Sequence, residues 1–92
     1  MPGPAISESE IRTLVRQRIE NGTLPVLLVH NVDGGYGSGH TCRICGEPIL
    51  ASQVEYEVRE DSASRGKFHM KCYAIWQLEC AERIQSSGQP KD

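Results

Sequence analysis

Two short stretches decide the fold of this 92-residue chain: Cys42-Arg43-Ile44-Cys45 and, far downstream, His69-Met70-Lys71-Cys72. Each stretch places two metal-binding side chains with two residues between them. Zn²⁺ prefers thiolate and imidazole ligands in a tetrahedron, and four protein ligands leave no position for water or substrate. The spacing therefore predicts one structural Zn²⁺, bound by Cys42, Cys45, His69 and Cys72.

The residues around the two pairs agree with such a site. Gly46 directly follows Cys45 and permits a tight turn with positive φ, so that both thiolates can reach one ion. His69 and Cys72 are three positions apart, and such side chains share one face at the start of a helix. The positive end of a helix also stabilises a thiolate. We expect the second imidazole nitrogen to donate to a carbonyl or carboxylate.

A knuckle, a β-hairpin and a helix in this order resemble the treble-clef family of zinc-binding domains. The C-x2-C and H-x2-C pairs are similar to the first half of a LIM domain, over roughly residues 39–84. A LIM domain continues into a second zinc unit, which this chain lacks, and the helix through Trp76 is longer than in a LIM half. The chain is also similar to small uncharacterised bacterial zinc-binding proteins. The resemblance implies a zinc-stabilised α+β fold and a bias toward binding proteins.

Three further residues are rival metal ligands. Cys80 follows Cys72 by eight positions, about 12 Å along one helix, which is too far for a shared zinc. We interpret Cys80 as a small buried apolar residue. His40 could replace His69, but its position two residues before Cys42 is awkward for one tetrahedron. We interpret His30, which follows an apolar run, as a strand-end residue.

The sequence before the first cysteine predicts a helix over residues 8–20. Ser7 and Glu10 form a capping box, with Ile6 and Ile11 as a hydrophobic staple. Apolar residues recur at helical spacing from Ile11 onward, and Gly22 after Asn21 permits a left-handed stop.

The remaining elements follow from short patterns. Residues 24–30 are partly β-branched and indicate a short strand or extended segment. Residues 31–39 contain four glycines, so we expect a loop there; the stretch matches neither a P-loop nor a dinucleotide-binding motif. Apolar alternation over 54–58 predicts a strand with one buried face, and Lys67-Phe68 begins the return strand. A second helix is expected from about 69 to 86.

These elements predict an α+β fold whose core is a small zinc-stabilised treble clef. Residues 1–10 have neither a basic start nor an apolar core, so we expect no signal peptide. The longest apolar run is far too short to span a bilayer. Without an export signal we expect a cytoplasmic protein, in which cysteine pairs bind metals more often than they form disulfides. The expected parts are a disordered lead (1–6), an N-terminal helix (7–22), the treble-clef domain with its leading strand and loop (23–86) and a flexible tail (87–92).

The charge balance bears on function. With 10 basic and 12 acidic residues the net charge is −2, so no global field attracts nucleic acid or an anionic membrane. We therefore predict a non-enzymatic structural-zinc module that mediates protein–protein interaction. The alternative is a nucleic-acid-binding or transcription-associated zinc finger, with a local basic patch of Arg12, Arg16, Arg43, Arg65 and Lys67.

The sequence also bears on an enzymatic role and on a cluster of acidic residues. An enzyme is the least favoured class, because no nucleophile–base pair or paired carboxylates are evident and the zinc has no open position. A cluster of acidic residues on and after the strand expected at 54–58 is interpreted as a solvated strand face, and a surface that binds a partner is the alternative. The residues favour no particular role for the glycine-rich loop 34–39 and no oligomeric state. The acidic cluster comprises Glu55, Glu57, Glu60 and Asp61.

Overall fold

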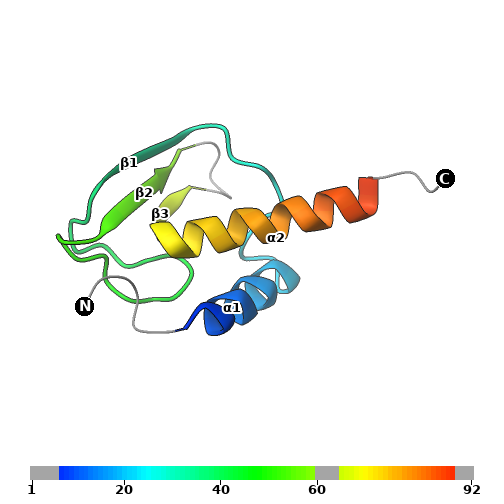
Figure 1. Cartoon of the computed structure of the whole chain (residues 1–92), viewed down its shortest axis with the longest axis horizontal. Coiled ribbons are helices and arrows are strands. Elements are labelled where there is room, and N and C mark those ends of the chain that lie inside the picture. Colours follow the sequence, from blue (N-terminus) through cyan, green and yellow to red (C-terminus); the bar gives the residue numbers. More distant parts are fainter. Residues whose placement is uncertain (1–6, 60–64, 89–92) are drawn as a thin grey trace.

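The computed structural model describes residues 7–59 and 65–88 of the chain. Its elements are α1 (Glu8–Glu20), β1 (Val32–Tyr36), β2 (Val54–Val58), β3 (Gly66–His69) and α2 (Met70–Gly88). The strands form one antiparallel sheet in the order β1-β2-β3. Helix α2 lies between this sheet and α1 (Figure 1). The expected α+β class is confirmed. Within the described residues no helix combines the length and apolar character needed to cross a membrane.

Helix α1 has the predicted bounds because its ends are closed locally. The Ser7 hydroxyl accepts from the Glu10 amide at 3.3 Å, and the Glu10 carboxylate accepts from the Ser7 amide at 3.0 Å. At the other end Gly22 has φ of 84°, and the amides of Gly22 and Thr23 donate to carbonyls in the last turn. Ile6, one half of the predicted staple, lies outside the described residues.

The short strand expected at residues 24–30 is an extended segment without a strand partner among the described residues. Side chains of α2 take the place of that partner. The Gln77 amide accepts from Val29 N at 2.8 Å and donates to the Leu27 carbonyl at 3.1 Å. Trp76 Nε1 donates to the Pro25 carbonyl at 3.0 Å. The helix therefore satisfies backbone groups that a neighbouring strand would otherwise pair.

The loop expected at residues 31–39 is wrong over 32–36, which form β1. Pairing with β2 outweighs the low strand preference of glycine, and the glycines allow close approach. A Cβ added to Gly34 would lie 3.2 Å from Tyr56 Cε1 on the paired strand. A Cβ at Gly37 would collide with the backbone carbonyl of Leu50. Side chains at these two positions would thus disturb the local structure.

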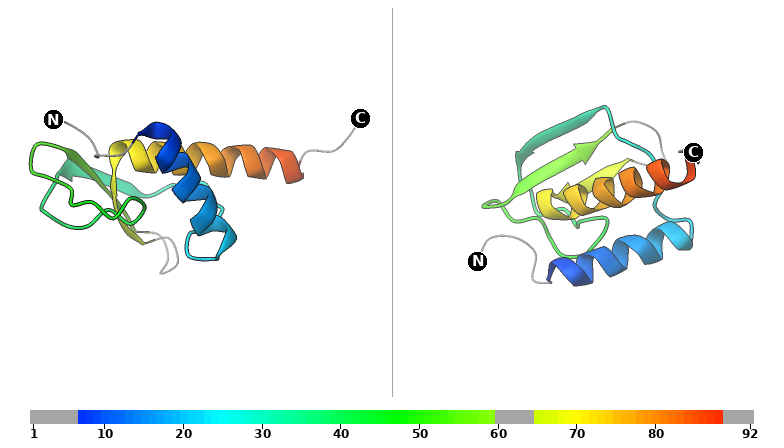
Figure 2. Two further views of the ribbon diagram at one scale, coloured as in Figure 1. Left: turned by 90° about the horizontal axis from the view of Figure 1, so that it is seen from below. Right: turned by 45° about the vertical axis from the view of Figure 1, so that its right-hand side comes forward.

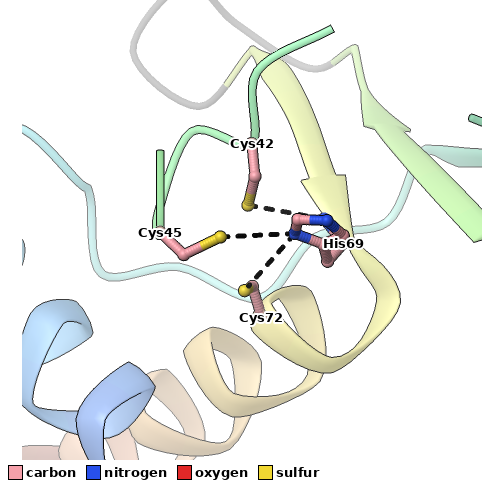
Figure 3. Close-up of side chains that lie close together, drawn as sticks. All are labelled: Cys42, Cys45, His69 and Cys72. Carbon is pink, nitrogen blue, oxygen red and sulfur yellow. Dashed lines mark hydrogen bonds between the residues drawn. The ribbon is translucent and has the colours of Figure 1, made fainter. Parts of the chain in front are cut away.

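The β2–β3 hairpin confirms the two expected strands and leads to α2. The single buried face expected over 54–58 is only partly present, because Val58 is fully buried whereas Val54 is 38% exposed. His69 is the last residue of β3, and the helix begins at Met70 rather than at His69. Because side chains alternate along a strand, Phe68 and His69 point to opposite faces. Phe68 is fully buried and stacks on Trp76 of α2, with ring centroids 5.1 Å apart. His69 points away from this core, toward the turn that carries the first two cysteines (Figure 3).

Candidate metal centre

The structure brings the four predicted ligands together from three elements. Cys42 and Cys45 lie on the turn before β2, His69 ends β3, and Cys72 lies in the first turn of α2 (Figure 3). One donor atom from each side chain lies within 4.8 Å of all the others. A tetrahedral zinc site with bonds of about 2.0–2.3 Å has donor separations of roughly 3.5–3.8 Å. The cluster is thus close enough to hold a metal ion.

The turn that carries Cys42 and Cys45 is closed by its own backbone. Gly46 N donates to the Cys42 carbonyl at 3.0 Å, and Cys42 N donates to the Glu47 carbonyl at 2.9 Å. Gly46 has φ of 79°, as its position after the second cysteine predicts. The Lys67 carbonyl of β3 accepts from Arg43 N at 2.9 Å, and this bond fixes the turn against β3.

Helix α1 contributes to the same turn from the opposite side. Arg18 Nε donates to the Ile44 carbonyl at 2.9 Å. The Arg43 guanidinium of the turn donates to the carbonyl of Thr23, just after α1, at 2.7 Å. It also donates to the carbonyl of Arg65, just before β3, at 2.9 Å. These bonds join the end of α1, the cysteine turn and the start of β3. The N-terminal helix therefore helps to position two of the candidate ligands.

The imidazole of His69 is oriented by contacts to both ring nitrogens. Nε2 lies 3.2 Å from the Pro48 carbonyl and 3.2 Å from Gln53 Oε1. The Gln53 oxygen is identified by Leu50 N, which donates to it at 2.7 Å. Two acceptors at Nε2 require a proton there, so Nδ1 has a free lone pair. That lone pair faces the sulfurs of Cys45 at 3.3 Å and Cys72 at 4.0 Å.

The three thiols shift one another's pKa values. Hydrogen bonds from Cys45 and Cys72 hold the pKa of Cys42 far below its ordinary value. The pKa of Cys72 is raised by its hydrogen bonds with Cys42 and Cys45, and that of Cys45 is raised by Cys42. Cys42, His69 and Cys72 are at most 2% exposed. Because cysteine binds a metal as the thiolate, binding of a cation at these side chains would release protons.

The rival ligands lie outside this cluster. Cys80 is fully buried, its Sγ donates to the Pro25 carbonyl at 3.6 Å, and burial raises its pKa. Its predicted place in the apolar core is confirmed. His40 Nδ1 lies 2.6 Å from Ser38 Oγ, and His30 is exposed.

Most of the predicted basic patch is engaged inside the domain. Arg12 and Arg16 both contact the buried carboxylate of Glu79, at 3.2 Å and 3.0 Å. Arg43 binds backbone carbonyls, as described above. Lys67 Nζ lies 3.1 Å from Glu57 directly across the β2–β3 ladder. The same pair neutralises part of the predicted acidic cluster, of which Glu60 and Asp61 lie outside the described residues.

The sequence did not reveal the residue that orients His69. Gln53 is 7% exposed and its oxygen lies against the imidazole, but no spacing rule connects a glutamine to the ligand pairs. Only a second-nitrogen acceptor of unspecified identity was expected.

Comparisons of the chain with protein-family models, with curated proteins and with solved structures found no match.

Proposed function

We propose that this protein is a non-enzymatic module in which one structural Zn²⁺ stabilises a surface for binding another protein. The observation that carries the proposal is the donor set: three cysteine sulfurs and one imidazole nitrogen within 4.8 Å. Sulfur-rich tetrahedral sites of this composition select zinc over harder cations such as Mg²⁺ and Ca²⁺. Free thiols of this kind fit a reducing compartment, which favours the cytoplasm.

The order of elements around the site supports a treble-clef arrangement. A tight turn supplies Cys42 and Cys45, the β2–β3 hairpin follows, and the first turn of α2 supplies Cys72. His69 departs slightly from the expectation because it precedes the helix. The additional elements are α1 and β1, which distinguish the chain from a LIM-type half.

The absence of an enzymatic role rests on the filled coordination sphere. Four protein ligands leave no site for a water whose pKa the metal could lower. Cobalt substitution tests this directly, since Co²⁺ in a closed sulfur-rich tetrahedron gives intense visible bands. We expect these bands to be unchanged by azide or cyanide. A spectral change without loss of metal would reveal an exchangeable position and contradict the proposal.

A protein partner is favoured by the surface that the fold leaves exposed. Several large apolar side chains are between 37% and 84% exposed, while four of the five residues of the expected basic patch have partners within the domain. Adjoining exposed apolar side chains favour protein contacts, whereas isolated ones are ordinary. They comprise Val26, Leu28, Val32, Tyr36, Leu50, Val54, Met70, Leu78 and Ile84.

Affinity purification with matched variants tests the partner class. Val26 and Leu28 are exposed neighbours on the extended segment, at 42% and 44%. We expect a protein captured by the wild type to be lost with Val26→Lys/Leu28→Lys and retained with the control Gln85→Lys on the exposed side of α2. The nucleic-acid alternative predicts instead that DNA or RNA binds with an affinity that falls steeply with salt. That result would contradict the proposal.

A further inference from the structure

Strand β1 leaves one edge of the sheet open. It is the first strand in the order β1-β2-β3, and all five of its residues are exposed. One side of β1 pairs with β2 in antiparallel register. On the other side, no strand pairs with it in the described part of the chain. An edge of this kind can accept a strand from another chain.

The register identifies which backbone groups point outward. Gly37 N donates to the Gln53 carbonyl at 2.9 Å, and Arg59 N donates to the Asn31 carbonyl at 3.4 Å. In an antiparallel ladder, alternate residues direct both polar groups to the same neighbour. Asp33 and Gly35 therefore face β2. The N–H and C=O groups of Val32, Gly34 and Tyr36 face outward, and within residues 7–59 and 65–88 they form no backbone hydrogen bond.

The outward residues belong to the apolar face of the sheet. Gly34 lies opposite Tyr56, whose ring contacts Tyr73 of α2 at a centroid distance of 5.1 Å. Val32 and Tyr36 share this face by alternation but are 37% and 84% exposed. Helix α2 contacts β2 and β3 but not β1, so β1 lies beyond the part of the sheet that α2 covers (Figure 2).

The edge lacks most of the features that normally prevent strand pairing. Protected edges carry lysine, proline, a bulge or an inward-pointing charge. β1 has none of these among its residues Val-Asp-Gly-Gly-Tyr. Its one charge, Asp33, points to the other face and forms a 2.8 Å ion pair with Arg59.

We propose that β1 pairs antiparallel with β1 of a second copy of this chain, about a two-fold axis at Gly34. In this register Val32 faces Tyr36 of the second copy, Gly34 faces Gly34, and every outward N–H and C=O of the three residues gains a partner. The two sheets become one continuous sheet. Pairs of β-branched and aromatic side chains across neighbouring strands are favourable. The arrangement is isologous, as in most homodimers.

The sequence of β1 selects this register over its neighbours. A two-fold axis at Asp33 would place the two Asp33 carboxylates directly opposite each other, which is unfavourable. An axis at Gly35 would pair Tyr36 with Gly34 and leave Val32 without its aromatic neighbour. With the axis at Gly34, Asp33 faces Gly35 and no like charges meet. The edge is thus self-complementary in side chains, charge and hydrogen bonds.

Light scattering of the full, zinc-loaded chain after size-exclusion chromatography tests the dimer. We expect a mass that rises with concentration toward twice the 10.2 kDa of one chain. Tyr36→Lys should raise the dimer dissociation constant roughly tenfold or more, because a lysine protects a strand edge. Leu78→Lys is the matched control, since Leu78 is an exposed apolar residue of α2. It should leave the constant unchanged, and the metal content of both variants confirms that they fold.

Amide hydrogen exchange identifies the interface. At concentrations that give the dimer, the amides of Val32, Gly34 and Tyr36 should become protected, whereas those of Asp33 and Gly35 are protected at all concentrations. A monomer at every concentration, or a dimer whose outward amides exchange freely, contradicts the proposal. Protection that arises only when a different protein is added also contradicts it. These measurements do not depend on the partner tested above.

Discussion

His69 shows how single contacts prepare a metal ligand. Its Nε2 is held by the Pro48 carbonyl and the Gln53 side chain, each at 3.2 Å, so Nδ1 is directed to the sulfurs. Acceptors behind a ligating histidine fix its ring orientation and raise its basicity. Gln53 also accepts from Leu50 N, which holds the glutamine itself in place. These contacts fix both the ring plane and the tautomer that leaves Nδ1 available to a metal ion.

Replacing Gln53 with alanine should weaken zinc binding about 10–100-fold, the usual effect of removing such a second partner. Gln17→Ala is the control, because Gln17 is an exposed residue of α1 that is not one of the four candidate ligands. Competition with a chromophoric chelator measures both affinities. Equal zinc affinity in the two variants would show that the Pro48 carbonyl alone orients the imidazole.

At the scale of elements, one buried carboxylate joins the two helices. The Glu79 side chain on α2 is 4% exposed and contacts Arg12 and Arg16 of α1. Burial opposes ionisation of Glu79, but the hydrogen bonds from Arg16 and Arg12 outweigh it, so its pKa is lowered. A lowered folded-state pKa means that the contribution to stability is present above the ordinary value of 4.5 and is lost as the pH falls through the folded value.

Glu79→Gln should therefore reduce the free energy of unfolding at pH 7 by roughly 1.5–3 kcal/mol, the range for hydrogen bonds to charged groups. The glutamine keeps the shape of the side chain but removes the negative charge that Arg12, Arg16 and Arg83 share. Arg12 then keeps its more exposed partner Glu8. Glu82→Gln on the exposed side of the same helix should change little. Urea unfolding of the zinc-loaded proteins measures both. A loss no larger than that of the control would assign the helix contact to apolar packing alone.

The elements differ in how well the sequence predicts them. Helix α1 and strand β2 are specified locally, by the Ser7–Glu10 cap and by alternation over 54–58, and both are confirmed. β1 is specified by its partner: glycines have no intrinsic strand preference, and only pairing with β2 orders residues 32–36. The extended segment at 24–30 shows the converse. Its strand-like residues contact the Gln77 and Trp76 side chains of α2 instead of a strand.

For the whole molecule, the four candidate ligands lie where three parts of the fold meet. The cysteine turn, the β2–β3 hairpin and α2 each supply donors, and α1 is bonded to the same turn through Arg18. The sequence predicts the grouping of the four side chains because spacing and ligand chemistry are local. It does not reveal Gln53 or the arginine contacts, since those depend on how distant segments pack.

Removal of the metal should unfold the region from the cysteine turn through α2. Metal binding in small zinc domains contributes about 10–16 kcal/mol, which equals or exceeds the usual stability of about 5–15 kcal/mol. A strong chelator should therefore collapse the dispersion of amide resonances for residues 39–84, and added zinc should restore it. Dispersion that survives complete removal of zinc would show that the apolar core suffices.

Metal analysis of the purified protein and its cysteine variants tests the central claim most directly. We predict one zinc per chain in the wild type and in Cys80→Ser, because Cys80 lies in the core outside the cluster. Cys45→Ser and Cys72→Ser should lose the metal, since each removes one of four donors. A metal-free Cys80→Ser protein, or stoichiometric zinc in both Cys45→Ser and Cys72→Ser, would contradict the assignment of Cys42, Cys45, His69 and Cys72 as the zinc ligands.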